Sequence, residues 1–103
     1  MREYNYNIEL DTELGKRYGT MQLFVDGTKV NGFMSILKHT KPFFGDISTD
    51  GNCKLYGKIV TLIKEITYTA TGKIYNGELY LNVQSGKSNY TLKGVATDNM
   101  EEN

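Results

Sequence analysis

Apolar and polar residues alternate with a period of two along most of the chain, as Tyr4, Tyr6, Ile8 and Leu10 do near its start. Successive side chains of a β-strand point to opposite faces, so this alternation is typical of strands with one buried face. No long segment keeps the 3.6-residue period of a helix. We therefore predict strands throughout, over residues 3–10, 19–25, 28–37, 43–49, 53–61, 64–75, 78–84 and 88–97.

Glycine-containing pairs separate neighbouring apolar runs and predict hairpin turns between them. Each turn implies a register, because residues paired across an antiparallel hairpin share a face. At three turns a two-residue loop places the apolar residues of both strands on the same face. At the fourth turn a three-residue loop is needed to do so. The implied pairs are Leu23 with Val30 across Asp26-Gly27, Ile47 with Leu55 across Asp50-Gly51-Asn52, Gly72 with Leu81 across Asn76-Gly77, and Leu81 with Leu92 across Gly86-Lys87.

One stretch leaves the strand count open at seven or eight. Between Thr61 and Ile66 there is no Gly or Pro, yet the inward-facing positions change from odd to even numbers. A tight turn at Leu62-Ile63, a bulge in one long strand and a short helical turn are all consistent with this change. We also expect longer loops before residue 19 and from Lys38 to Pro42.

A weak repeat of the form apolar-x-Gly-x-apolar places glycines at inward positions. Its copies run over Val30 to Met34, Phe43 to Ile47, Leu55 to Ile59, Ala70 to Ile74 and Leu92 to Ala96. Glycine weakens a strand, so its repeated use indicates either sharp bending at barrel corners or close packing against a large side chain. A hollowed interior is a further interpretation, which we rank below curvature around a filled core.

A meander of this kind must bury one apolar face, and closing into an up-and-down barrel also removes exposed edges. We predict an all-β, closed or nearly closed barrel; an open sheet packed against a second copy is the alternative. The pattern resembles the small calycin-like barrels, which include lipocalins, avidins and fatty-acid-binding proteins. It also resembles short bacterial β-meander proteins with Gly-x-apolar steps. There is no Trp for the lipocalin Gly-x-Trp motif or an avidin Trp set, so the resemblance implies architecture only.

Composition narrows the function classes. The chain has 103 residues, which fits one domain, predicted over residues 1–97 with a disordered polar tail over 98–103. Twelve basic and twelve acidic residues give zero net charge, which argues against nucleic-acid and acidic-lipid partners. No apolar run is long enough for a spanning helix, and the N-terminal pattern is not that of a signal peptide. We expect a cytoplasmic protein.

Few residues offer catalytic or metal-binding chemistry. His39 is the only histidine and has no second His to relay a proton, and Cys53 occupies an inward position where a small core side chain is expected. One Cys and one His disfavour a zinc site. Glu9, Asp11 and Glu13 lack calcium-loop spacing, and we interpret them as solvated loop charges. We predict no enzyme activity, metal or cofactor.

Aromatic residues offer the remaining candidates. The segment Lys38 to Phe44 holds the only Pro, the only His and a Phe pair. It is a candidate barrel mouth for a small apolar ligand, although a loop plugged by Phe43 is the plainer interpretation. Six aromatics sit at outward positions, and a contiguous patch of them would mark an interface. The candidate mouth residues are His39, Phe43, Phe44 and Tyr68. The candidate interface residues are Phe24, Phe33, Tyr56, Tyr75 and Tyr80.

The leading functional prediction is a non-catalytic binding or protein-interaction module, with a homodimer or another protein as partner. The alternative is a carrier of a small apolar ligand inside the barrel, and a small enzyme is the third. A ligand interior requires a cavity of roughly 300 Å³ or more. A core filled by Leu23, Leu55, Leu81 and Leu92 argues against it.

Overall fold

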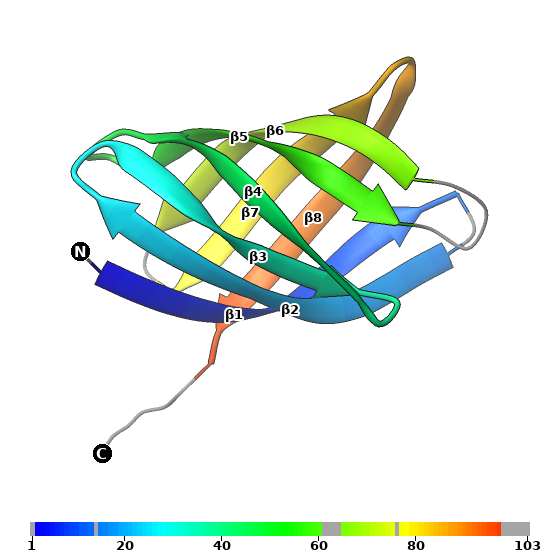
Figure 1. Ribbon diagram of the computed structural model, residues 1–103, viewed down its shortest axis with the longest axis horizontal. Coiled ribbons are helices and arrows are strands. Elements are labelled where there is room, and N and C mark those ends of the chain that lie inside the picture. The colour runs from blue at the N-terminus through cyan, green and yellow to red at the C-terminus, as the bar shows by residue number, and fades with distance from the viewer. Residues whose placement is uncertain (1, 14, 61–64, 76, 98–103) are drawn as a thin grey trace.

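The computed structural model describes residues 2–13, 15–60, 65–75 and 77–97, and these form eight antiparallel β-strands joined as a meander (Figure 1). The eight strands settle the count that the sequence left open. They are β1 (Arg2–Thr12), β2 (Gly15–Asp26), β3 (Lys29–Ile36), β4 (His39–Ile47), β5 (Asn52–Val60), β6 (Glu65–Tyr75), β7 (Glu78–Ser85) and β8 (Ser88–Ala96).

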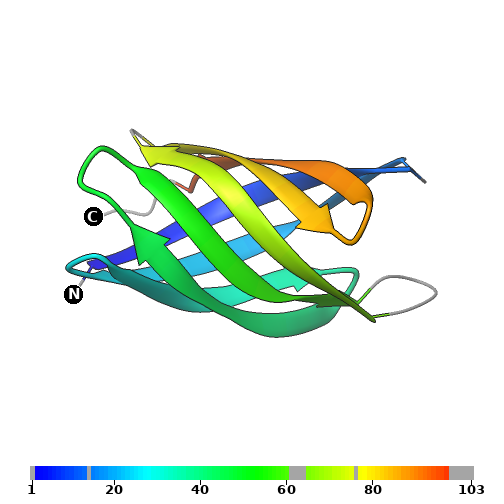
Figure 2. The same ribbon diagram turned by 90° about the horizontal axis from the view of Figure 1, so that it is seen from above.

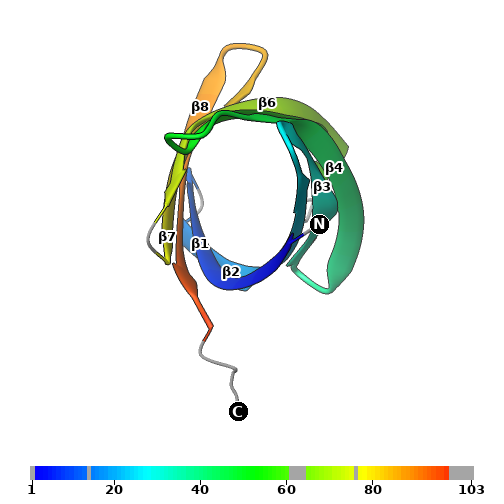
Figure 3. The ribbon, with the colours of Figure 1, turned by 90° about the vertical axis from the view of Figure 1, so that its left-hand side faces the viewer.

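The sheet closes on itself, which confirms the predicted all-β up-and-down barrel. Each strand pairs with the next along the chain, and β1 also pairs with β8, where Ile8 lies opposite Gly94. Viewed along the long axis, the strands form a ring (Figure 3). The strands run obliquely to that axis (Figure 2), as closure of a sheet requires. The molecule measures 39 × 26 × 18 Å.

Inward-facing side chains of all eight strands fill the barrel with one hydrophobic core. The core includes Leu23, Leu55, Leu81 and Leu92, each with 0% of its surface exposed. No charged side chain is buried in the part of the chain that the structure describes. Because the sheet closes on itself, its apolar face is buried inside the barrel and needs no second sheet or helix to cover it.

Two of the predicted hairpin registers are confirmed. Gly72 lies opposite Leu81 between β6 and β7, and Leu81 lies opposite Leu92 between β7 and β8. In the β7–β8 turn Gly86 has a φ of 59°, the left-handed conformation expected at the first position of a type II′ turn.

The predicted register between β2 and β3 is wrong by two residues. Leu23 pairs with Gly32 rather than Val30, and the loop is Gly27-Thr28 rather than Asp26-Gly27. Gly27 has a φ of 63° and takes the first loop position, which leaves Asp26 in the strand opposite Lys29. A shift of two keeps every side chain on its predicted face, so the apolar pattern cannot distinguish the two registers.

The predicted register between β4 and β5 also shifts by two. Ile47 pairs with Cys53 rather than Leu55, because the three-residue loop is formed by residues 49–51 instead of 50–52. The Ser48 amide donates to the Asn52 carbonyl at 2.8 Å, and the Asn52 amide donates to the Ser48 hydroxyl at 3.2 Å. Hydrogen bonds at Ser48 therefore determine where the loop begins, which alternation alone does not reveal.

The two longer loops predicted from the sequence are mostly strand. Thr12 pairs with Gly15, so residues 13–14 alone separate β1 from β2. Ile36 pairs with His39, so Leu37 and Lys38 form the whole turn between β3 and β4. Near the ends of the barrel, inward-facing side chains reach solvent and can be polar. The apolar-polar alternation that identifies a strand is therefore absent there. The residues between β5 and β6, 61–64, and the predicted tail, 98–103, lie outside the described part of the chain.

Two inward glycines illustrate why the repeat uses glycine. A Cβ at Gly32 would lie 1.9 Å from the Gln22 carbonyl oxygen, so this glycine allows two backbones to approach closely. A Cβ at Gly57 would lie 2.7 Å from the Tyr68 hydroxyl, so here the missing side chain makes room for a ring. Close packing therefore accounts for these two glycines, and they lie in a filled core rather than a hollow one.

Candidate functional site

An open cavity of about 610 Å³ occupies one end of the barrel, and we call it the cup. It lies at the left-hand end of Figure 1, where β1 begins and the β2–β3 and β4–β5 turns are found. Its walls are mainly apolar side chains that point inward from five strands, with tyrosines on β1. The lining includes Tyr4, Tyr6, Leu23, Val25, Ile47, Ile74 and Ala96.

The cup is confined to the end because the middle of the barrel is filled. Leu55, Leu81 and Leu92 are fully buried at that level. Leu23, also fully buried, lines the cup from β2. A ligand at this end would therefore rest on a packed hydrophobic floor.

Two charged residues lie at the rim of the cup, and they differ in the number of hydrogen bonds that they form with the rest of the protein. Nη1 of Arg2 donates a hydrogen bond to the Tyr4 hydroxyl at 3.3 Å. On the opposite side of the ring, the Asp50 carboxylate accepts hydrogen bonds from the Ser48 hydroxyl and, at 3.1 Å, from the Asn52 side-chain amide. These bonds lower the pKa of Asp50, so the carboxylate stays ionised and holds the β4–β5 turn.

Tyr6 brings a hydroxyl group into the apolar part of the site. Its side chain is 3% exposed, and burial raises its pKa to about 12. Tyr4 and Cys53 lie close enough to contribute to the same shift. No residue that the structure describes forms a hydrogen bond with the Tyr6 hydroxyl.

The four candidate mouth residues from the sequence lie in three different environments. Phe43 and Tyr68 are buried and meet across Gly57, in one row of paired residues from β4, β5 and β6. His39 is exposed at the start of β4, at the other end of the barrel from the cup. Phe44 points outward, 64% exposed, with its ring centroid 5.6 Å from that of Tyr56.

The structure separates the two residues that a cysteine–histidine pair would need. Cys53 lies opposite Ile47, at the far end of β4 from His39, which places the two roughly 27 Å apart along the strand. Burial raises the pKa of Cys53 to about 11, so the thiol is protonated near neutral pH and is a weak nucleophile. These two residues do not form a catalytic dyad.

The outward aromatics form two groups rather than one patch. Phe24, Phe33, Phe44 and Tyr56 are neighbours across β2 to β5. The second group lies across β6, β7, β8, β1 and β2, where a groove of about 560 Å³ is found. Four exposed large hydrophobic residues line this groove, which we call the tyrosine groove: Tyr18, Tyr75, Tyr80 and Val95.

Charges alternate with rings along the tyrosine groove. Lys73 of β6, Tyr80 of β7, Lys93 of β8, Glu9 of β1 and Tyr18 of β2 follow one another as cross-strand partners. The Lys93 ammonium lies 6.0 Å from the Tyr80 ring centroid. The groove therefore combines apolar rings with both signs of charge.

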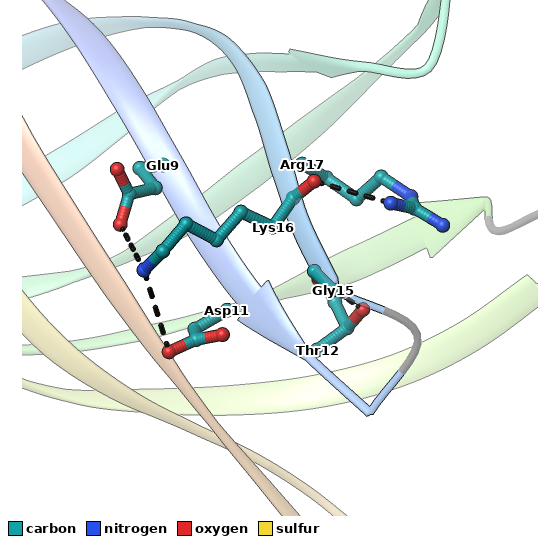
Figure 4. Close-up of polar contacts among 6 residues, drawn as sticks. All are labelled: Glu9, Asp11, Thr12, Gly15, Lys16 and Arg17. Atoms are coloured by element: carbon teal, nitrogen blue, oxygen red, sulfur yellow. Dashed lines mark hydrogen bonds and ion pairs between the residues drawn. The ribbon is translucent and has the colours of Figure 1, made fainter.

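Of the three acidic residues interpreted as loop charges, Glu9 and Asp11 are ion-paired on β1, and Glu13 lies in the turn that follows it. Nζ of Lys16 lies 2.9 Å from the Glu9 carboxylate and 3.7 Å from that of Asp11, as Figure 4 shows. Arg17 turns to the other side of β2 and donates to the Lys16 carbonyl at 3.1 Å. Glu9 and Asp11 thus lie on β1 rather than in a loop. The described residues contain no group of three His, Cys, Asp or Glu side chains that could hold a metal ion.

Sequence reasoning did not single out Arg2 or Tyr4 as site residues. The available signal was the spacing Arg2-x-Tyr4-x-Tyr6, which places all three side chains on one face of a strand. That signal did not show that this face lines a cavity, because the cavity depends on how far β1 extends past the core.

Comparison of the chain with protein-family models, curated proteins and solved structures found no match. A search of the described residues found no helix long and apolar enough to cross a membrane.

Proposed function

We propose that this chain is a non-catalytic binding protein that takes a small, largely apolar ligand into the cup. The observation that carries the proposal is the cavity of about 610 Å³, which has apolar inner walls and a polar rim that includes Ser48, Thr49 and Asp50. Ligand sites are typically concave, 300–1,000 Å³ in volume, and mainly apolar with a few polar groups. The proposed site is the end of a calycin-like barrel rather than its centre, which Leu55, Leu81 and Leu92 fill.

A cup-filling substitution tests the proposal. Val25 lines the cup, whereas Phe24, its neighbour on β2, points outward. We expect Val25→Trp to weaken binding of decan-1-ol by about tenfold or more, because the indole ring occupies the ligand's volume. Phe24→Trp places the same ring outside the barrel and should leave binding unchanged. Amide chemical-shift titrations measure both, and circular dichroism checks the fold.

The absence of decan-1-ol binding to the unmodified protein would contradict the proposal. Equal binding by the two Trp variants would contradict the assignment of the site to the cup.

Self-association through the tyrosine groove is a second candidate function. The supporting observation is that Tyr18, Tyr75, Tyr80 and Val95 share one groove and remain exposed. A two-fold symmetric dimer brings the same patch of both copies together in inverted orientation. Glu9 in this groove is already paired with Lys16, so the exposed rings and Val95, rather than the charges, are what a second copy of this chain would cover.

A further inference from the structure

Three polar side chains line the cup along a single strand, and we call them the β1 track. Arg2, Tyr4 and Tyr6 are alternate residues of β1, so their side chains share its inner face at intervals of about 6.8 Å. Arg2 is exposed, Tyr4 half-buried and Tyr6 buried. The track therefore runs from the rim of the cup into its wall.

The outer part of the track has donor capacity that the protein does not use. The guanidinium of Arg2 carries five N–H donors, and one hydrogen bond, to the Tyr4 hydroxyl, is formed. Within residues 2–13, 15–60, 65–75 and 77–97, no carboxylate pairs with Arg2. Tyr4 accepts in that hydrogen bond, so its own O–H remains able to donate.

The inner part of the track is a buried donor. The Tyr6 hydroxyl has no hydrogen-bond partner among the described residues, although its side chain is 3% exposed. The Tyr68 hydroxyl is likewise buried without a partner among the described residues, but it lies in the core, whereas Tyr6 lines the cup, where an acceptor atom of a ligand can reach its hydroxyl. The raised pKa of Tyr6 keeps the phenol protonated at neutral pH, and a protonated phenol donates.

The opposite rim does not compete for such a ligand. The Asp50 carboxylate keeps its charge, but hydrogen bonds from Ser48 and Asn52 hold it in the β4–β5 turn, across the cup from Arg2. Elsewhere the walls are apolar, from Leu23, Val25 and Ile47. The cup thus pairs an apolar body site with unused donors on one side.

We propose that the cup selects amphipathic anions, with a carboxylate or similar acceptor-only head held by the β1 track and an apolar body against the walls. This inference rests on the proposed function of the cup. An acceptor-only head matches a row of donors, and the charge of Arg2 strengthens those hydrogen bonds. The head lies between Tyr4 and Tyr6 and accepts from both hydroxyls, and the guanidinium of Arg2, which is hydrogen-bonded to Tyr4, adds its positive charge.

Three probes with the same ten-carbon body and different heads test the inference: decanoate, decan-1-ol and decyltrimethylammonium. Amide chemical-shift titrations below the aggregation concentration of each probe give the dissociation constants. We expect decanoate to bind about tenfold more tightly than decan-1-ol, and the cation to bind most weakly. Equal affinities for the three probes would overturn the anion preference and leave the proposed function standing. No binding of any probe would overturn both.

Substitutions on the track assign the preference to its residues. Arg2→Gln removes the charge of an exposed side chain and should abolish the tenfold preference of the cup for decanoate over decan-1-ol. Tyr6→Phe keeps the ring and removes the donor, and should reduce the preference by several-fold. Lys87→Gln is the matched control, because it removes one positive charge from the β7–β8 turn at the other end. A preference that survives Arg2→Gln, or that Lys87→Gln abolishes equally, would refute the assignment.

Discussion

At the scale of single residues, the polar atoms inside this barrel belong to side chains that are otherwise apolar. Tyr6, Tyr68 and Cys53 are buried, and burial raises the pKa of each because the charged form loses its hydration. All three are therefore neutral over the ordinary pH range. Their ionisation becomes a source of instability only in alkaline solution.

We expect ionisation of the buried Cys53 thiol to cause the first loss of stability in alkaline solution. Its pKa rises from the ordinary 9.0 to about 11 in the folded chain. Between these values the unfolded state has lost the proton that the folded state keeps, so the free energy of unfolding falls as pH rises. The full effect is roughly 2 to 3 kcal/mol, present below pH 9 and lost by pH 11. Urea unfolding at a series of pH values measures it.

Cys53→Ala is the control for this titration. Tyr6 and Tyr68 contribute mainly above pH 10, since burial raises the pKa of both from 10.0. The thiol therefore dominates the change between pH 9 and 10, and the alanine variant shows how much of it the tyrosines cause. A variant whose stability falls as steeply as that of the unmodified protein in this interval would contradict the prediction.

At the scale of elements, the turns differ in how well their residues suit the backbone. Leu37 and Lys38 form the β3–β4 turn with φ values of 55° and 68°. Positive φ at both central positions is the type I′ geometry, which normally uses Asn and Gly. A side chain in this conformation costs roughly 1–2 kcal/mol per residue. Closure of the barrel maintains a turn that these residues disfavour.

Replacing Lys38 by glycine is therefore expected to stabilise the barrel. Lys38 is exposed, so Lys38→Gly removes the strain without a loss of core packing. We expect a gain of about 1 kcal/mol in the free energy of unfolding, measured by urea denaturation.

The β7–β8 turn supplies the matched control. Lys87 also occupies the second position of a two-residue turn, but its φ is not positive. Lys87→Gly should be destabilising by roughly 0.5 kcal/mol, because it adds only freedom to the unfolded chain. A similar response to both substitutions would show that strain at Lys38 is not the cause.

At the scale of the whole molecule, closure leaves one end open and places unpartnered rings on the outside. If the tyrosine groove binds a second copy, the mass measured by light scattering should rise from 11.7 kDa toward twice that value with concentration. Tyr80→Asp should keep the protein monomeric, because it places a carboxylate at the centre of the groove.

Phe44→Asp distinguishes a specific interface at the tyrosine groove from nonspecific hydrophobic association. Phe44 is 64% exposed and Tyr80 is 59% exposed, but Phe44 lies in the other aromatic group. The dimer should survive this change. A protein that is strictly monomeric at high concentration, or one disrupted equally by both substitutions, would exclude the groove as the interface.

Alternation and turn residues determined the strands and much of their pairing. The β6–β7 and β7–β8 registers followed from Asn76-Gly77 and Gly86-Lys87, because these turns leave a single two-residue loop that aligns the apolar faces. The β2–β3 and β4–β5 registers could not be settled in this way. A shift by two residues preserves the faces, and hydrogen bonds at Ser48 and the φ of Gly27 made the choice.

The candidate site depends more strongly than the strand registers do on which residues the fold brings together from distant parts of the chain. The spacing Arg2-x-Tyr4-x-Tyr6 placed three side chains on one face of a strand, but the cup also requires Val25, Ile47 and Ile74 from other strands. The sequence directed attention to the segment from His39 to Phe44 instead, since it holds rare residue types. In the structure this segment is strand, and its exposed and buried residues face different surroundings.

The sequence by itself determined an all-β meander with one buried face, since a period of two and glycine-marked turns are local properties of the chain. Only the tertiary structure decided that β1 closes onto β8 and that core leucines fill the middle while one end stays open. Closure and cavity volume are sums over side chains distant in sequence. Spacing along one strand cannot specify them.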